Sequence, residues 1–220
     1  MARVLEIRKN VLAKNDEIAR ENREFFRSRG LTALNFVSSP GAGKTSLLVR
    51  TINDMKTGVK FAVIEGDQQT DNDAKKIEQT GAPVIQINTV SSCHLDADMV
   101  KKSLGSLDMD GAKYLFIENV GNLVCPASYD LGEMMKVAVM SVTEGEDKPV
   151  KYPKMFRVSS ALVITKTDLL PYLDFDVKMA VDYALKVNPA IRVFKVSVKN
   201  GDGLADWYKF LLTLSDAAGR

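Results

Sequence analysis

The sequence has little cysteine, little histidine and almost no net charge, and each shortage narrows the class of protein. Its 220 residues include two cysteines, too few for a disulfide framework, and a single histidine. The 30 basic and 28 acidic residues leave a net charge of +2, so charge gives no argument for nucleic acid or an anionic membrane as a partner. We expect a protein of the reducing cytoplasm whose thiols are available for other uses.

Long hydrophobic runs are also missing. No apolar run approaches the ~18 residues that a membrane span requires, and the charged N-terminus argues against a secretory signal. The content of 45% hydrophobic and 26% charged residues is typical of a globular protein. Because there is no internal repeat and no clear linker, we expect one domain over residues 1–220.

The apolar pattern predicts an N-terminal helix followed by alternating strands and helices. In residues 2–29 apolar pairs recur with heptad spacing, which indicates an amphipathic helix that either docks on the domain's own sheet or serves self-association. Within residues 31–214 the expected strands are 31–37, 60–64, 83–87, 114–118, 135–142, 161–165 and 192–198. The expected helices are 44–55, 71–79, 95–107, 176–187 and 204–214, and residues 143–158 are expected to form a loop. This alternation predicts an α/β fold with a mostly parallel sheet and helices on both faces.

The segment after the first strand has the pattern of a phosphate-binding loop. It reads Ser38-Ser39-Pro40-Gly41-Ala42-Gly43-Lys44-Thr45-Ser46, with Ser38 where the usual motif has its first glycine. We expect residues 40–46 to surround the phosphates with backbone N–H groups at a helix N-terminus. Lys44 is the catalytic candidate that reaches the β- and γ-phosphates, and the Thr45 hydroxyl is a ligand for Mg²⁺. The alternative is a glycine-rich surface turn with a solvated lysine.

Two further segments indicate which base is bound. Thr165-Lys166-Thr167-Asp168 resembles the [NT]-K-x-D motif of GTP-binding proteins, in which the Asp168 carboxylate would accept two hydrogen bonds from guanine. The aliphatic part of Lys166 would pack along the base. Ser197-Val198-Lys199 resembles, more weakly, the loop that completes the guanine pocket. The alternative for Asp168 is a helix cap at the end of a strand.

Carboxylates follow two other strands, and parallel strands bring their carboxyl ends to one edge of the sheet. Glu118 and Gly121 hold the place of a D-x-x-G switch, with Glu118 as an Mg²⁺ ligand and the Gly121 N–H facing the γ-phosphate. Asp67 is a second candidate for the Mg²⁺ shell and for catalysis. Asp71 and Asp73 are catalytic candidates that either orient the attacking water or cap a helix.

Soft metal ligands are expected at the same edge. Cys93 and His94 follow the third strand, and Cys125 lies shortly after Gly121. Thiolate and imidazole suit Zn²⁺, Ni²⁺ or Cu⁺ rather than Mg²⁺. Three ligands do not fill a tetrahedral structural site, so water or a second subunit would complete it. The alternative is two inert cysteines and a surface histidine.

Together these segments resemble the HypB family, the nickel-insertion GTPases of [NiFe]-hydrogenase maturation. The resemblance rests on residues 38–45, 65–70, 93–95, 118–126, 151–153 and 165–170. It implies a P-loop NTPase fold, GTP hydrolysis with Mg²⁺, and a GTP-dependent homodimer. It also implies that Cys93, His94 and Cys125 bind Ni²⁺ or Zn²⁺ at the dimer interface. The implied partners are the hydrogenase large-subunit precursor and accessory nickel-maturation proteins, with no nucleic acid or membrane.

Two departures qualify what the resemblance implies. The chain carries neither a C-x-x-C-G-C motif nor a histidine-rich tract, so we expect the interface site to be its only nickel site. Asn122 rather than glutamine follows the switch glycine and no arginine finger is evident, so we expect slow turnover, about 10⁻⁴ to 10⁻³ s⁻¹. The alternatives are a urease-type nickel inserter, a GTPase with purely structural zinc, and a GTP-gated adaptor in which both cysteines only pack.

Overall fold

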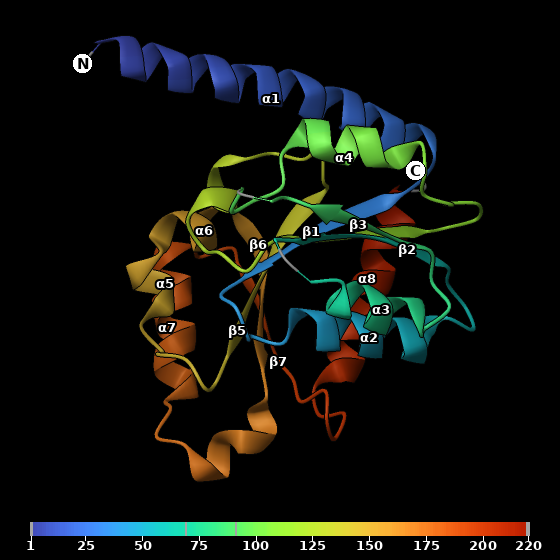
Figure 1. Ribbon diagram of the computed structural model, residues 1–220. Helices are drawn as coiled ribbons and strands as arrows, with labels where there is room; N and C mark the ends of the chain where they lie inside the picture. Colours follow the sequence, from blue (N-terminus) through green and yellow to red (C-terminus); the bar gives the residue numbers. More distant parts are fainter. Residues whose placement is uncertain (1, 69, 91, 219–220) are drawn as a thin grey trace.

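The computed structural model describes residues 2–68, 70–90 and 92–218, and over these residues it forms a seven-stranded, all-parallel sheet with helices on both faces (Figure 1). The strands are β1 (Thr32–Ser38), β2 (Phe61–Asp67), β3 (Val84–Asn88), β4 (Tyr114–Glu118), β5 (Met135–Ser141), β6 (Ser159–Thr165) and β7 (Arg192–Lys195). Their order in the sheet is β3-β2-β4-β1-β5-β6-β7. The predicted α/β fold is confirmed.

The helices cover the sheet in two layers. They are α1 (Ala2–Ser28), α2 (Lys44–Met55), α3 (Asn72–Glu78), α4 (Ala97–Leu104), α5 (Lys148–Lys151), α6 (Pro153–Val158), α7 (Val177–Val187) and α8 (Leu204–Ala218). Two 3₁₀ turns add to them, η1 (Cys125–Ser128) and η2 (Thr167–Tyr172). Within the described residues, no helix combines the length and apolar character that crossing a bilayer requires.

Successive side chains of the central strands point to opposite faces of the sheet and pack in opposite helical layers, as the two-residue period of a strand requires. Leu34 and Phe36 of β1 pack with α2 and α8, whereas Ala33 packs under α1 and α4. A third apolar cluster joins β5 and β6 to α6 and α7. On the α2–α8 side the buried Trp207 indole donates a hydrogen bond to Thr51 Oγ1 at 3.1 Å.

The N-terminal helix is observed close to its expected bounds, and it docks on the body of the domain. Its C-terminal half packs on α4 and β1, with Ala19 and Phe26 buried. Figure 1 shows the N-terminal half continuing past α4, away from the sheet.

The expected loop over residues 143–158 is wrong, because that segment contains α5 and α6. Pro149 and Pro153 each occupy the first turn of one of these helices. A first-turn N–H has no partner inside the helix, so proline starts a helix there rather than breaking it. The expected helix 95–107 is shorter at both ends and begins after Asp96, whose carboxylate accepts a hydrogen bond from the Met99 N–H at 2.8 Å.

Candidate nucleotide and metal site

The loop between β1 and α2 borders a cavity of about 450 Å³ at the carboxyl edge of the sheet. Gly41 and Gly43 have φ angles of 75° and 91°, a region in which residues with side chains are strained. The first N–H groups of α2 have no partner inside the helix, so they are available to an anion. The lining residues are 40–46, 65–68, Asp73, Lys76, 118–121 and Lys166.

Lys44 and Thr45 lie beside Glu118 inside this cavity. Lys44 is nearly buried, and its Nζ donates to Ser38 Oγ at 3.1 Å and lies 3.9 Å from Glu118 Oε1. Thr45 Oγ1 donates to the same carboxylate oxygen at 2.7 Å. Ser38, which departs from the usual motif, therefore holds the lysine in this structure.

Two buried carboxylates face each other across neighbouring strands. Glu65 of β2 and Glu118 of β4 are register partners, and each has one buried oxygen for which the described residues offer no hydrogen bond. Burial raises the pKa of Glu65 to about 8, and it also raises the pKa of Glu118. Buried oxygen ligands without partners, next to the Thr45 hydroxyl, fit a hard divalent cation such as Mg²⁺.

The three candidate aspartates at and after the end of β2 have different surroundings. Asp67 lies on the cavity wall and accepts hydrogen bonds from the Gln68 N–H at 2.5 Å and the Thr70 hydroxyl at 2.8 Å. Asp73 also lines the cavity and pairs with Lys76 at 2.7 Å.

Asp71 is the exception among these three. It is the N-cap residue of α3, but its side chain makes no capping hydrogen bond. It pairs with Lys75 at 2.7 Å and faces a separate hollow beside the cavity.

The expected base-recognition residues come together beyond the phosphate loop. Thr165 Oγ1 donates to the Ala42 carbonyl at 2.6 Å, and Lys166 Nζ donates to the Gly41 carbonyl at 2.8 Å. Ser197 Oγ donates to Asp168 Oδ1 at 2.6 Å, which joins the two loops that were matched to a guanine pocket. The neighbouring Val198 carbonyl accepts a hydrogen bond from Arg50, whereas Lys199 is exposed.

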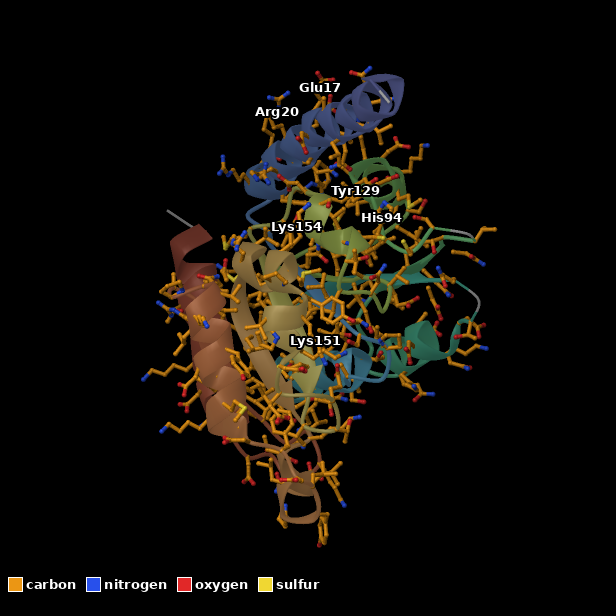
Figure 2. All side chains as sticks on the ribbon, turned by 90° about the vertical axis from the view of Figure 1, so that its left-hand side faces the viewer. Glu17, Arg20, His94, Tyr129, Lys151 and Lys154 are labelled. Carbon is orange, nitrogen blue, oxygen red and sulfur yellow. The ribbon has the colours of Figure 1, made fainter. Side chains whose placement is uncertain are left out.

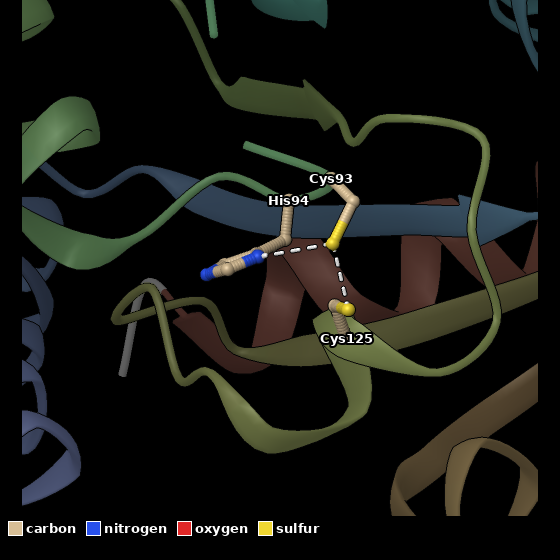
Figure 3. Close-up of side chains that lie close together, drawn as sticks. All are labelled: Cys93, His94 and Cys125. Atoms are coloured by element: carbon tan, nitrogen blue, oxygen red, sulfur yellow. Dashed lines mark hydrogen bonds between the residues drawn. The ribbon is translucent and has the colours of Figure 1, made fainter. Parts of the chain in front are cut away.

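Cys93, His94 and Cys125 converge although they come from two loops (Figure 3). Their ligand atoms all lie within 4.8 Å of one another, with 2.7 Å between the two sulfurs and 3.8 Å from Cys93 Sγ to His94 Nδ1. The His94 ring lies against Tyr129 at a centroid distance of 3.9 Å. Burial lowers the pKa of His94, which favours the neutral, metal-binding imidazole, and the hydrogen bond to Cys125 raises the pKa of Cys93.

The segment predicted to be a switch, residues 118–121, and the following Asn122 connect these three candidate ligands to the nucleotide cavity. Asn122 Nδ2 donates to the Cys93 carbonyl at 3.2 Å, and Asn119 Oδ1 accepts from the Leu95 N–H at 3.1 Å. A side chain at Gly121 would meet the Pro40 backbone at 3.1 Å, so the glycine allows the switch segment to touch the phosphate loop. Short contacts therefore join residues 119–122 to the phosphate loop on one side and to the loop of Cys93 and His94 on the other.

Sequence reasoning missed several residues of the cavity. Glu65 and Asn119 are buried at strand ends, and Lys76 reaches the cavity from α3. Lys148 donates to Ser39 Oγ in the phosphate loop and pairs with Glu144 at 2.7 Å. A charge directly after the predicted strand 60–64 was an available signal for Glu65, whereas Lys148 lies in residues 143–158, for which the sequence predicts a loop.

The fold and the phosphate loop define a P-loop nucleotide-binding protein. Comparison with known families agrees, because the model of the CobW/HypB/UreG nucleotide-binding domain matches residues 32–195. The hydrogenase maturation factor HypB of Rhizobium leguminosarum bv. viciae is 54% identical over 209 residues, which cover 95% of this chain and 70% of the relative. That of Escherichia coli strain K12 is 54% identical over 211 residues, or 96% of this chain and 73% of the relative.

A solved structure extends the likeness to three dimensions. The crystal structure of HypB from Helicobacter pylori in complex with nickel matches with a TM-score of 0.87 and 40% identity, over 93% of this chain and 96% of the other. The chain belongs to the HypB hydrogenase maturation factors of the CobW/HypB/UreG family. The resemblance drawn from the sequence is thereby confirmed.

Proposed function

We propose that this protein is a slow GTPase that uses its nucleotide to control a nickel ion during [NiFe]-hydrogenase maturation in the cytoplasm. One observation carries the proposal: three soft ligands lie within 4.8 Å of one another, and a hydrogen bond joins the Cys93 loop to the segment whose residues 118–121 line the nucleotide cavity. The solved relative from Helicobacter pylori is a complex with nickel, which supports nickel as the cargo.

GTP would bind with its triphosphate on residues 40–46 and its guanine between the two loops after β6 and β7. Lys44 would neutralise the β- and γ-phosphates. Asp168 would recognise guanine by accepting two hydrogen bonds, with Ser197 holding the carboxylate in place. The stem of Lys166 would lie along the base, and Val198 and Lys199 would close its far side.

Mg²⁺, when bound, would neutralise charge between the β- and γ-phosphates. Thr45, Asp67 and Glu118 are the residues proposed to hold it, and the partnerless oxygens of Glu118 and its neighbour Glu65 support this position. Asp73 on the cavity wall is better placed than Asp71 to orient an attacking water. The missing arginine finger keeps the proposed turnover slow.

The γ-phosphate would order the segment from Glu118 to Gly121, and Asn122 would pass the change to the Cys93 loop. Two subunits would then pair, each contributing Cys93, His94 and Cys125 to nickel or zinc. Hydrolysis would release this constraint, and the ion would pass to the hydrogenase large-subunit precursor with the help of accessory maturation proteins.

The test is calorimetric titration of Ni²⁺ and Zn²⁺ into the GDP form and into a form with a non-hydrolysable GTP analogue, with a sizing column run on both. We expect tighter binding and a dimer with the analogue. Replacing Cys125 with alanine should remove stoichiometric nickel binding and leave GTP binding intact. Equal metal affinity and equal size in the two nucleotide states would contradict the proposed coupling, and a metal held regardless of nucleotide would indicate structural zinc.

A further inference from the structure

Two buried asparagines of α1 contact both loops that carry the metal ligands. Asn15 and Asn22 are 6% and 1% exposed, and they lie two helical turns apart on the face of α1 that meets the domain. Buried amides are costly unless their hydrogen bonds are made, so their partners indicate what each amide is for.

Both asparagines bridge the same two segments. Asn15 Oδ1 accepts from the Ala97 N–H at 2.9 Å, and its Nδ2 donates to the Asp130 carbonyl at 2.8 Å. Asn22 Nδ2 donates to the Ala97 carbonyl at 2.9 Å and to the Leu131 carbonyl at 3.0 Å. The backbone of Ala97 is therefore held on both its N–H and its C=O by a single helix.

The bridged segments are the continuations of the two ligand loops. Ala97 begins α4, directly after the loop of Cys93 and His94, and the other segment follows the η1 turn that starts at Cys125. Arg23 of α1 adds a pair of 2.7 Å hydrogen bonds to the Asp130 carboxylate. Figure 2 shows His94 and Tyr129 lying below α1, so these two rings in contact are on the side that the helix covers.

We propose that Asn15 and Asn22 are positioning residues of the soft-metal site, and that α1 sets the spacing between its two ligand loops. The inference deepens the proposed function and rests on the metal ligands assigned there. Ligands on separate loops bind a metal tightly only when their spacing is fixed before the metal arrives, since otherwise binding must also order the loops. Hydrogen bonds from one rigid helix to both loops supply that order.

The test compares Asn15→Ala and Asn22→Ala with the wild-type chain. The nickel dissociation constant would be measured by competition with a chromophoric chelator, together with the sulfur-to-nickel charge-transfer absorption and the affinity for a fluorescent GDP analogue. We expect nickel binding to weaken about 10-fold or more in each variant, with an altered charge-transfer band and unchanged nucleotide affinity. Asn15→Asp keeps the acceptor for the Ala97 N–H but sets a carboxylate oxygen against the Asp130 carbonyl, so it should weaken nickel binding at least as much as Asn15→Ala.

Glu17→Ala and Arg20→Ala are the matched controls, because both side chains are exposed on the outer side of the same helix (Figure 2). Folded Asn15 and Asn22 variants that bind nickel as the controls do would overturn the proposal. Equal weakening in the controls would overturn it too, since the effect would then belong to the helix as a whole. If Asn22→Ala does not fold, the two Asn15 variants decide. A wild-type chain that binds no nickel would overturn the proposed function itself.

Discussion

Glu65 is the residue whose surroundings depart furthest from what a carboxylate prefers. It is 3% exposed, lies near the carboxyl end of β2, and faces the second buried carboxylate of Glu118. A carboxyl group in such a place gives up hydration when it ionises and repels its neighbour, so it retains its proton to higher pH. The contribution of Glu65 to the free energy of unfolding therefore depends on pH.

Replacing Glu65 with glutamine should remove one pH-dependent part of the stability of the nucleotide-free protein. The folded pKa of about 8 lies above the ordinary value of 4.5, so this group's contribution is fully present below 4.5 and is lost as the pH rises through about 8. From about pH 6 to about pH 9, the wild-type free energy of unfolding should fall by about 2 to 3 kcal/mol more than that of Glu65→Gln. Urea unfolding at several pH values measures this, and parallel curves would contradict it.

Asp168 is the residue on which base selectivity is proposed to depend. Its Oδ1 already accepts the Ser197 hydroxyl, which orients the carboxylate. Asp168→Ala should weaken GDP binding by roughly 1 to 3 kcal/mol, because two guanine donors lose their acceptor. Competition of GDP and of ADP against a fluorescent nucleotide measures the preference for guanine over adenine, and this preference should decrease in the variant. Unchanged discrimination would mean that the base binds elsewhere.

Among the elements, α1 depends on a close approach at Gly132. This glycine has a φ angle of 90°, and a Cβ there would lie 2.6 Å from Asn22 Cβ and 2.7 Å from the Ala19 carbonyl oxygen. Both atoms belong to α1, so the glycine is what allows the helix to reach the chain segment after Cys125.

Gly132→Ala should therefore displace α1 from the chain segment around Gly132 on which it packs. Backbone strain at positive φ and the collision with the helix together should lower the free energy of unfolding by about 1 to 3 kcal/mol. Thermal and urea unfolding give the size of the effect, and hydrogen exchange in α1 gives its location. Gly81→Ala is a useful control, because it shares a positive φ but has nothing within 4 Å of the new Cβ. An equal loss in both variants would attribute the effect to strain alone.

An element or a contact could be predicted from the sequence where the residues that determine it are close together in the chain. The phosphate loop, its flanking strand and helix, and the guanine motif are contiguous patterns, so their places in the sheet followed from the sequence. The sequence did not predict the helices α5 and α6, because their prolines indicated a loop. Proline is compatible with a helix when it lies in the first turn, as it does in both. The partners of Asn15 and Asn22 are 75 to 115 residues away, which no local pattern indicates.

In the molecule as a whole, the nucleotide cavity and the three proposed metal ligands lie at the same edge of the sheet. Asn122 follows the cavity residue Gly121 and donates a hydrogen bond to the Cys93 carbonyl, so it connects the two sites. Asn122→Ala should shrink the difference in nickel affinity between the GDP and GTP-analogue forms, because the switch segment loses its hold on the Cys93 carbonyl. Nucleotide affinity should change little, since Asn122 does not line the cavity. Paired nickel titrations in the two states measure the effect, and an unchanged difference would place the link elsewhere.

The buried Trp207 gives the chain an optical probe of its own. It is the single tryptophan of the sequence, and it lies on the α2–α8 side of the sheet, whereas α1 and α4 cover the opposite side. An ion captured by the cysteines cannot quench this indole by contact. A shift in emission when nickel is added would therefore report movement transmitted through the sheet to α8, which carries Trp207, or to its hydrogen-bond partner Thr51 in α2.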